Sequence, residues 1–192
     1  RVVEPSNRDG DHAMELLNYM VIESGNWTLD DGTKVSAGTT NLSNYETNAL
    51  ITFGQTIDDP TILTQLQTFS NQQYVVTRTR SVNKNNFKTL METGEGMPTN
   101  NTQTETVGWI AMEPSVKTLD NNTIVEATKT DKNVTDDTRQ VNFTANFSSA
   151  PRLFTKIATY GGSDTANTRV DIDSLNSNRF KLFVQEETTG DS

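Results

Sequence analysis

The chain contains no cysteine and a single histidine, His12, among its 192 residues. The lack of cysteine excludes a disulfide framework, a thiolate metal site and a cysteine nucleophile. One histidine excludes a multi-histidine metal centre. No apolar run approaches the roughly 18 residues of a membrane span, and the start of the sequence has no signal-peptide pattern. The sequence therefore predicts no membrane span.

Basic and apolar residues are also scarce. Sixteen Lys and Arg stand against 25 Asp and Glu, a net charge of -9, which argues against a nucleic-acid groove. Hydrophobic residues make up 32% of the chain. Leu, Ile, Val and Phe together reach about 22%, just above the roughly 20% that separates folded from disordered chains. By contrast, threonine is abundant, and its branched side chain favours strands. We expect a thin β-structured core.

An internal duplication is the most informative pattern in the sequence. At an offset of about 90 residues, many positions match in the same order, with two short insertions. The matches include 17–23 with 107–113, 28–30 with 118–120, Phe53 with Phe143, Pro60 with Pro151, 77–78 with 168–169, and 86–88 with 179–181. So many ordered matches indicate two copies of one unit.

Each copy has the pattern of strands. Residues 74–82 alternate Val and Thr with Val and Arg, and turn signals such as Asp30-Asp31-Gly32 separate the apolar runs. Residues 20–23 are predicted as a strand because their partner in the second copy is one. Strands are expected within 17–23, 50–53, 62–69, 74–82, 107–112, 140–143 and 153–160. The fold class is all-β, built of tandem antiparallel six-stranded β-sandwich units.

The frame of the duplication is offset from the ends of the sequence. Residues 24–113 form one complete sandwich, residues 114–192 form a second that lacks its last strand, and residues 1–23 are the orphan end of another unit. A sandwich that lacks a strand recruits one from elsewhere. We expect the segment carrying Leu17, Tyr19 and Val21 to complete the trailing sandwich of a neighbouring copy, head to tail, as in an open filament. The competing possibility is that residues 1–23 fold back and close their own chain, which gives a monomer.

Four segments and two Thr-Arg pairs resemble the H-type lectin-like repeats found in tandem in large secreted or surface bacterial proteins. The segments are 25–33, 105–113, 147–151 and 180–186, and the pairs are 77–78 and 168–169. The resemblance covers essentially the whole chain. It implies a six-stranded antiparallel sandwich, often trimeric in the free lectins. Some members bind N-acetylgalactosamine through aromatic, His and Asp residues at a rim between subunits.

Few residues qualify as site candidates. Trp27 precedes a turn and has no aromatic partner in the second copy, so it is the better of the two tryptophans for stacking on a sugar. Arg78 and Arg169 recur at one place, as ligand contacts or as structural partners of an acid on a neighbouring strand. Asp9 and Asp11 are weak calcium candidates, since six to eight oxygens are needed and no EF-hand spacing is present. No other cofactor is expected.

A catalytic role is not expected. His12 lies in a predicted loop among charged and small residues, and acidic residues are too common for any pair to indicate a glycosidase. We expect a structural or adhesive repeat of an extracellular filament or giant surface adhesin, located outside the cell or at its surface. The alternative is a carbohydrate-binding module that recognises surface glycans, and a third is an accessory domain of a larger enzyme. The predicted core comprises Leu17, Tyr19, Val21, Ile51, Phe53, Leu66, Val107, Trp109, Val141, Phe143, Ile157 and Phe183.

Overall fold

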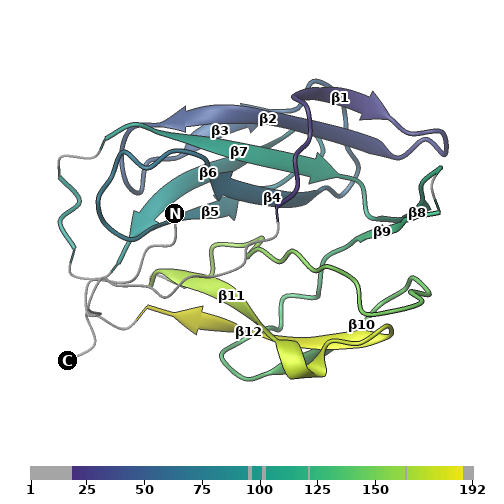
Figure 1. The fold of residues 1–192 in the computed structure, drawn as a ribbon. Helices are drawn as coiled ribbons and strands as arrows, with labels where there is room; N and C mark the ends of the chain where they lie inside the picture. The colour runs from purple at the N-terminus through teal and green to yellow at the C-terminus, as the bar shows by residue number, and fades with distance from the viewer. Residues whose placement is uncertain (1–18, 95–96, 101–102, 121, 163, 188–192) are drawn as a thin grey trace.

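The strands of the described residues fall into four antiparallel sheets (Figure 1). The structure is a computed structural model that describes residues 19–94, 97–100, 103–120, 122–162 and 164–187. Within these residues the helical structure amounts to one 3-10 turn, η1 (Ile172–Ser174). The all-β prediction is confirmed.

Residues 25–112 form two sheets that pack face to face. One sheet has the order β1 (Gly25–Thr28), β2 (Lys34–Leu42), β7 (Glu105–Met112), β4 (Thr61–Leu66). The other has the order β3 (Ala49–Thr52), β6 (Asn86–Thr93), β5 (Val75–Arg80). Buried side chains from both sheets meet in two clusters between them: Ile51, Phe53, Ile57, Ile62, Phe87 and Ala111, and Leu42, Tyr45, Met91 and Val107.

This first copy therefore has seven strands rather than the predicted six. The difference arises at the Asp30-Asp31-Gly32 turn, where Gly32 adopts a φ of 88° that favours glycine. The segments on either side of the turn form a hairpin, in which β1 pairs with the first residues of β2. The additional strand is the short, half-exposed β1.

Residues 115–186 repeat much of this arrangement in the same chain order. The hairpin β8 (Ser115–Thr118) and β9 (Ile124–Ala127) corresponds to β1 and β2. The sheet β10 (Arg139–Asn142), β12 (Arg179–Glu186), β11 (Ala166–Asp171) corresponds to β3-β6-β5. In Figure 1 this sheet lies below the strands of the first copy, and β8 and β9 lie at the right edge.

Local contacts also recur between the copies. The rings of Phe53 and Phe87 stack with centroids 5.7 Å apart and planes at 28°, and those of Phe143 and Phe180 stack at 5.3 Å and 26°. A pair of threonine hydroxyls is hydrogen-bonded in each copy: Thr64 with Thr77 at 2.9 Å, and Thr155 with Thr168 at 2.8 Å. The duplication in sequence is a duplication in structure at these positions.

The core prediction is only partly right. Ile51, Phe53 and Val107 are buried. Leu66 and Trp109 are half-buried against the core clusters. Four predicted members from the second copy are likewise half-buried: Val141, Phe143, Ile157 and Phe183.

Two predicted core members are exposed. Tyr19 is 87% exposed and Val21 is 83% exposed, so their placement in a core is wrong for this structure, and Leu17 lies outside the described residues. Residues 20–23 belong to no strand, which corrects that prediction as well. Burial of these side chains needs a sheet to pair with, and no described strand pairs with residues 19–23.

Candidate assembly groove

The strand β7 is the inner strand of its sheet and has no counterpart among the described residues of the second copy. In the first copy β7 pairs with β2 along residues 35–42 and with β4 along residues 61–66. Two segments of the second copy match residues that pair with β7 in the first copy, and neither is paired with a strand among the described residues.

The first of these segments is 128–132. The nine-residue β2 pairs with β1 only over residues 34–37, and its remaining part, residues 38–42, pairs only with β7. Its counterpart β9 has four residues, 124–127, which match 34–37. Residues 128–132 match the part of β2 that depends on β7, and they form no strand.

The second segment is 152–157, the counterpart of β4. In the first copy β4 is an edge strand whose one ladder is with β7. Residues 153–160 were predicted as a strand, but in the structure they have no regular secondary structure, so that prediction is wrong. The physical reason is the same: a β-strand is defined by its pairing, and no described strand pairs with these residues.

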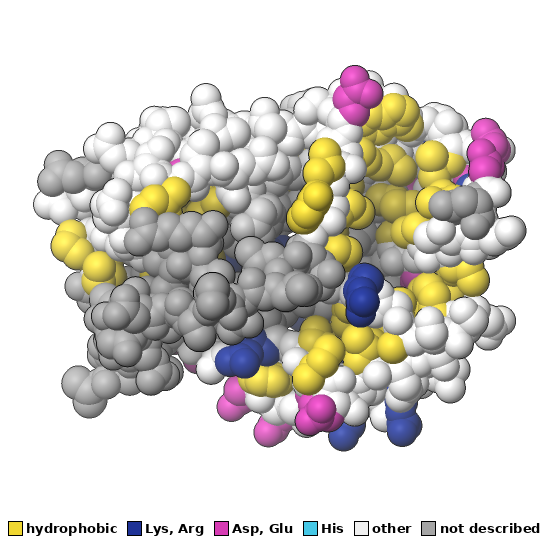
Figure 2. Space-filling view, in the orientation of Figure 1, with side chains coloured by type: hydrophobic (Ala, Val, Ile, Leu, Met, Phe, Trp, Pro, Cys, Tyr) yellow, Lys and Arg dark blue, Asp and Glu magenta, His cyan; other side chains and the backbone are white. Residues whose placement is uncertain are grey.

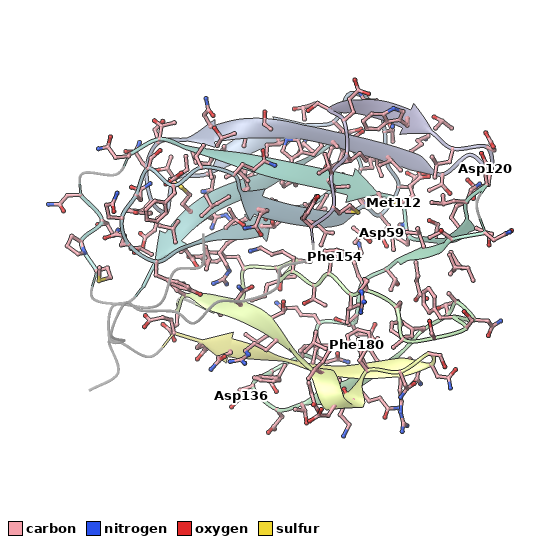
Figure 3. All side chains as sticks on the ribbon, in the orientation of Figure 1. Asp59, Met112, Asp120, Asp136, Phe154 and Phe180 are labelled. Atoms are coloured by element: carbon pink, nitrogen blue, oxygen red, sulfur yellow. The ribbon has the colours of Figure 1, made fainter. Side chains whose placement is uncertain are left out.

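A hollow of about 2030 Å³ lies between the two copies, lined in part by the segments 128–132 and 152–157 and also by Met20 and Ile22 of the same chain's leading segment. Its walls include Phe143, Leu153, Phe154 and Phe180 of the second copy and Met112 of the first. Figure 3 places Met112 at the end of β7 and Phe154 on the segment between the upper and lower sheets. Hydrophobic side chains gather around this hollow on the right of Figure 2. We call it the assembly groove.

The core of the second copy is open towards this groove. Phe53 is 6% exposed and Ile57 is fully buried in the first copy, whereas their counterparts Phe143 and Phe147 are half-buried. Phe154 is 45% exposed. Burial of these apolar side chains under a further strand would be favourable, by about 25 cal/mol for each Å² of apolar surface removed from water.

A buried carboxylate at the start of β7 shows what else this strand supplies. Glu105 is 2% exposed and accepts hydrogen bonds from the Thr68 hydroxyl at 2.5 Å and from the amides of Ser70 at 2.8 Å and Asn71 at 2.7 Å. Burial alone would raise the pKa of this carboxyl. Together the hydrogen bonds outweigh that effect and hold the pKa below its ordinary value. The matching residue in the leading segment is Glu15.

Arg78 joins the two copies. Its guanidinium forms an ion pair with Glu92 at 2.8 Å, both side chains being almost fully buried. The same Nη1 donates to the carbonyl of Asp164 in the second copy at 3.0 Å, and the guanidinium lies 4.8 Å from the centre of the Tyr160 ring. The Glu92 carboxylate raises the pKa of the Tyr160 hydroxyl. Desolvation, with Arg78 acting in the same direction, lowers the pKa of Lys156 in this region to about 8.

The other residues singled out from the sequence do not converge on one site. Trp27 is half-buried in β1, with its ring over Gly25. Arg169 is exposed and donates a hydrogen bond of 2.8 Å to Gln185. Gln185 stands at the position that Glu92 occupies in the first copy. Asp9 and Asp11 lie outside the described residues. Within the part of the chain that is described, no three His, Cys, Asp or Glu side chains cluster as metal ligands would.

Sequence reasoning missed two features of the groove. It predicted a last strand for the unit but not its place in the sheet, whereas β7 is an inner strand that pairs with both β2 and β4. Strand order has no signature in a single sequence. It also missed Glu92 and Glu105, although Glu105 lies at the start of a repeated segment and Glu15 recurs at the matching position.

Comparison with known proteins finds one informative relative. The chain is 32% identical over 165 residues, 85% of its length, to halomucin from Haloquadratum walsbyi, a halophilic archaeon. The matched stretch is 2% of that protein, so the chain spans a very small part of it. This relative gives no support to the expected bacterial source. No family model matches. No solved structure matches either, so the H-type lectin-like assignment stays a prediction.

Proposed function

We propose that this chain is a non-catalytic structural repeat of a very large extracellular protein, and that neighbouring repeats are joined by strand completion. The leading segment, residues 15–23, enters the assembly groove of an adjacent copy and takes the place that β7 has in the first copy. The contact is head to tail. A contact of this kind that does not close into a ring generates a linear array.

The observation that carries the proposal is the agreement between what the second copy lacks and what the leading segment offers. The segments 128–132 and 152–157 both lack the ladder that β7 provides to their counterparts. Residues 17–23 match β7 and Glu113 in sequence, and residues 19–23 are exposed and unpaired. Pairing would satisfy two rows of backbone groups and cover Tyr19 and Val21.

The comparison supports the location and scale in this proposal. Halomucin carries the name of a mucin, and mucins are extracellular proteins; we carry that location to this chain. A match of 85% of this chain to 2% of that protein fits a unit of a long array. No described helix has the length and apolarity needed to cross a membrane. The same strand completion applies whether adjacent copies are separate chains or successive parts of one polypeptide.

Sedimentation of the 192-residue chain tests the proposal. We expect its mass to rise from 21.3 kDa with concentration. Val21→Pro should hold it at the monomer mass, because proline removes a donor from the incoming strand. Asn7→Pro, upstream of the aligned segment, is the matched control and should assemble normally. A natural chain that stays monomeric at every concentration contradicts the proposal.

Carbohydrate binding is the alternative that the sequence raised. Arg78, buried in its ion pair with Glu92, is out of reach of a soluble sugar. Trp27 and Arg169 retain exposed surface, but no described contact brings them together. A glycan array on the natural chain with Trp27→Ala as control would favour the alternative only if binding appears and depends on Trp27.

A further inference from the structure

In the first copy some glycines lie directly against a neighbouring side chain. Where the second copy has another residue in place of such a glycine, it also has another residue in place of that neighbour. In the first copy a Cβ on Gly25 would stand 2.9 Å from the Trp27 ring, and the second copy has Ser115 and Lys117 at these positions. A Cβ on Gly54 would collide with Asn26, and the second copy has Thr144 and Val116. Each copy is thus packed around its own set of partners.

The same rule applies to positions at which β2 contacts β7. A Cβ on Gly38 would stand 2.8 Å from the ring of Trp109, which packs against Phe53 and Phe87 in the core. The second copy has Thr128 at the position of Gly38. The leading segment has Tyr19 at the position of Trp109, a smaller ring opposite a larger neighbour.

A second pair follows this pattern. A Cβ on Gly108 of β7 would collide with the side chain of Gln67. The leading segment has Asn18 at the position of Gly108, and the second copy has Ala158 at that of Gln67. Because Gln67 is exposed and flexible, this pair discriminates less strongly than the ring pair.

The aromatic cluster of the second copy is also adjusted to a smaller ring. At the position of Ile57 it has Phe147, whose ring meets Phe143 edge-on at 5.1 Å. Phe147 and Thr128 both add volume relative to the first copy, and Tyr19 removes volume relative to Trp109. Close-packed cores keep total volume nearly constant, so these changes compensate.

We propose that the assembly groove selects residues 15–23 of a second copy of this chain over residues 105–113, and holds them in one register. This inference rests on the proposed function. Tyr19 lies between Thr128 and Thr155, as Trp109 lies between Gly38 and Thr64. Glu15 then meets the 159–162 loop, where its carboxylate accepts hydrogen bonds as that of Glu105 does. The array therefore has one defined join.

Peptide binding tests the selection. The recipient is the full chain with Val21→Pro, which cannot donate its own leading segment. A labelled peptide of residues 13–24 should bind it about 5- to 140-fold more tightly than the same peptide with Asn18→Gly and Tyr19→Trp, which imitates β7, because overpacking of a filled core costs about 1–3 kcal/mol. Thr128→Gly in the recipient should recover most of the affinity of the imitating peptide.

The outcomes separate the two proposals. Equal binding of both peptides would overturn the selection while strand completion stands. If neither peptide binds, the proposed function fails as well. A gain of affinity for the natural peptide with the Thr128→Gly recipient, and none for the imitating peptide, would also overturn the selection.

Disulfide cross-linking tests the register separately. Since the natural chain has no cysteine, only the introduced cysteines can form disulfides. In the first copy Ile110 pairs with Ala37, so Met20 should face Ala127. Mild oxidation of the Met20→Cys, Ala127→Cys chain should join most copies into disulfide-linked oligomers. With Met20→Cys and Thr128→Cys, whose side chains point to opposite faces of the sheet, joining should be at least about tenfold slower. Equal rates would refute the register.

Discussion

Replacement of Arg78 by methionine is expected to lower the free energy of unfolding by about 3–5 kcal/mol, because it leaves a buried charge without its partner. Arg78 and Glu92 are 2% and 3% exposed, and their ion pair measures 2.8 Å. The change also removes the hydrogen bond to the carbonyl of Asp164 that joins the copies. Urea unfolding at neutral pH measures the effect.

Arg169→Met is the matched control at the equivalent position. Arg169 is exposed, and its partner Gln185 is neutral, so we expect a loss of less than about 1 kcal/mol. In the double variant Arg78→Met, Glu92→Leu, most of the loss should be recovered, because no unpaired charge is then buried. Similar losses for Arg78→Met and Arg169→Met would show that the burial of the Arg78–Glu92 pair has little energetic importance.

Replacement of Phe53 by alanine is expected to cost about 3–5 kcal/mol, the range for a large aromatic side chain removed from a filled core. Phe53 is 6% exposed and contacts the rings of Phe87 and Trp109. Its counterpart Phe143 contacts the rings of Phe180 and Phe147, but it is half-buried and no described ring takes the place of Trp109. In the unassembled chain we expect Phe143→Ala to cost about 1–2 kcal/mol.

The difference between these two positions should shrink on assembly. When the leading segment of another copy covers Phe143, the cost of Phe143→Ala should rise towards that of Phe53→Ala. Thermal unfolding of dilute and assembled samples of both variants measures the change. Equal costs in dilute solution would contradict the open state of the second copy.

The sequence was sufficient to indicate the duplication and to predict the strands β3, β4, β5, β7 and β10, because both depend on local patterns. The alternation in residues 74–82 and the turn residues around Gly32 are local signals, and β5 and a turn at Gly32 appear where they predict. The match of residues 17–23 to 107–113 also identified the strand concerned, since it needs only alignment of the chain with itself.

What the sequence could not predict depends on strand order. Residues 153–160 have the composition of a strand, but they form none, since no described strand pairs with them. Tyr19 and Val21 have the pattern of core residues, but no core in this structure receives them. Pattern identifies which residues are suited to burial, and pairing decides whether they are buried. The pairs built around Gly38 and Gly108 became visible only from side-chain contacts.

Hydrogen exchange at residues 128–132 and 152–157 tests the central claim most directly. These segments form no strand in the structure, and they match parts of β2 and β4 that pair with β7. In dilute natural chain their amides should exchange rapidly, whereas those of β2 and β7 are protected. At concentrations where the mass rises, exchange in both segments should slow by at least about tenfold, and Val21→Pro should abolish the slowing. Slow exchange already in the dilute monomer, or rapid exchange in the assembled state, would contradict strand completion.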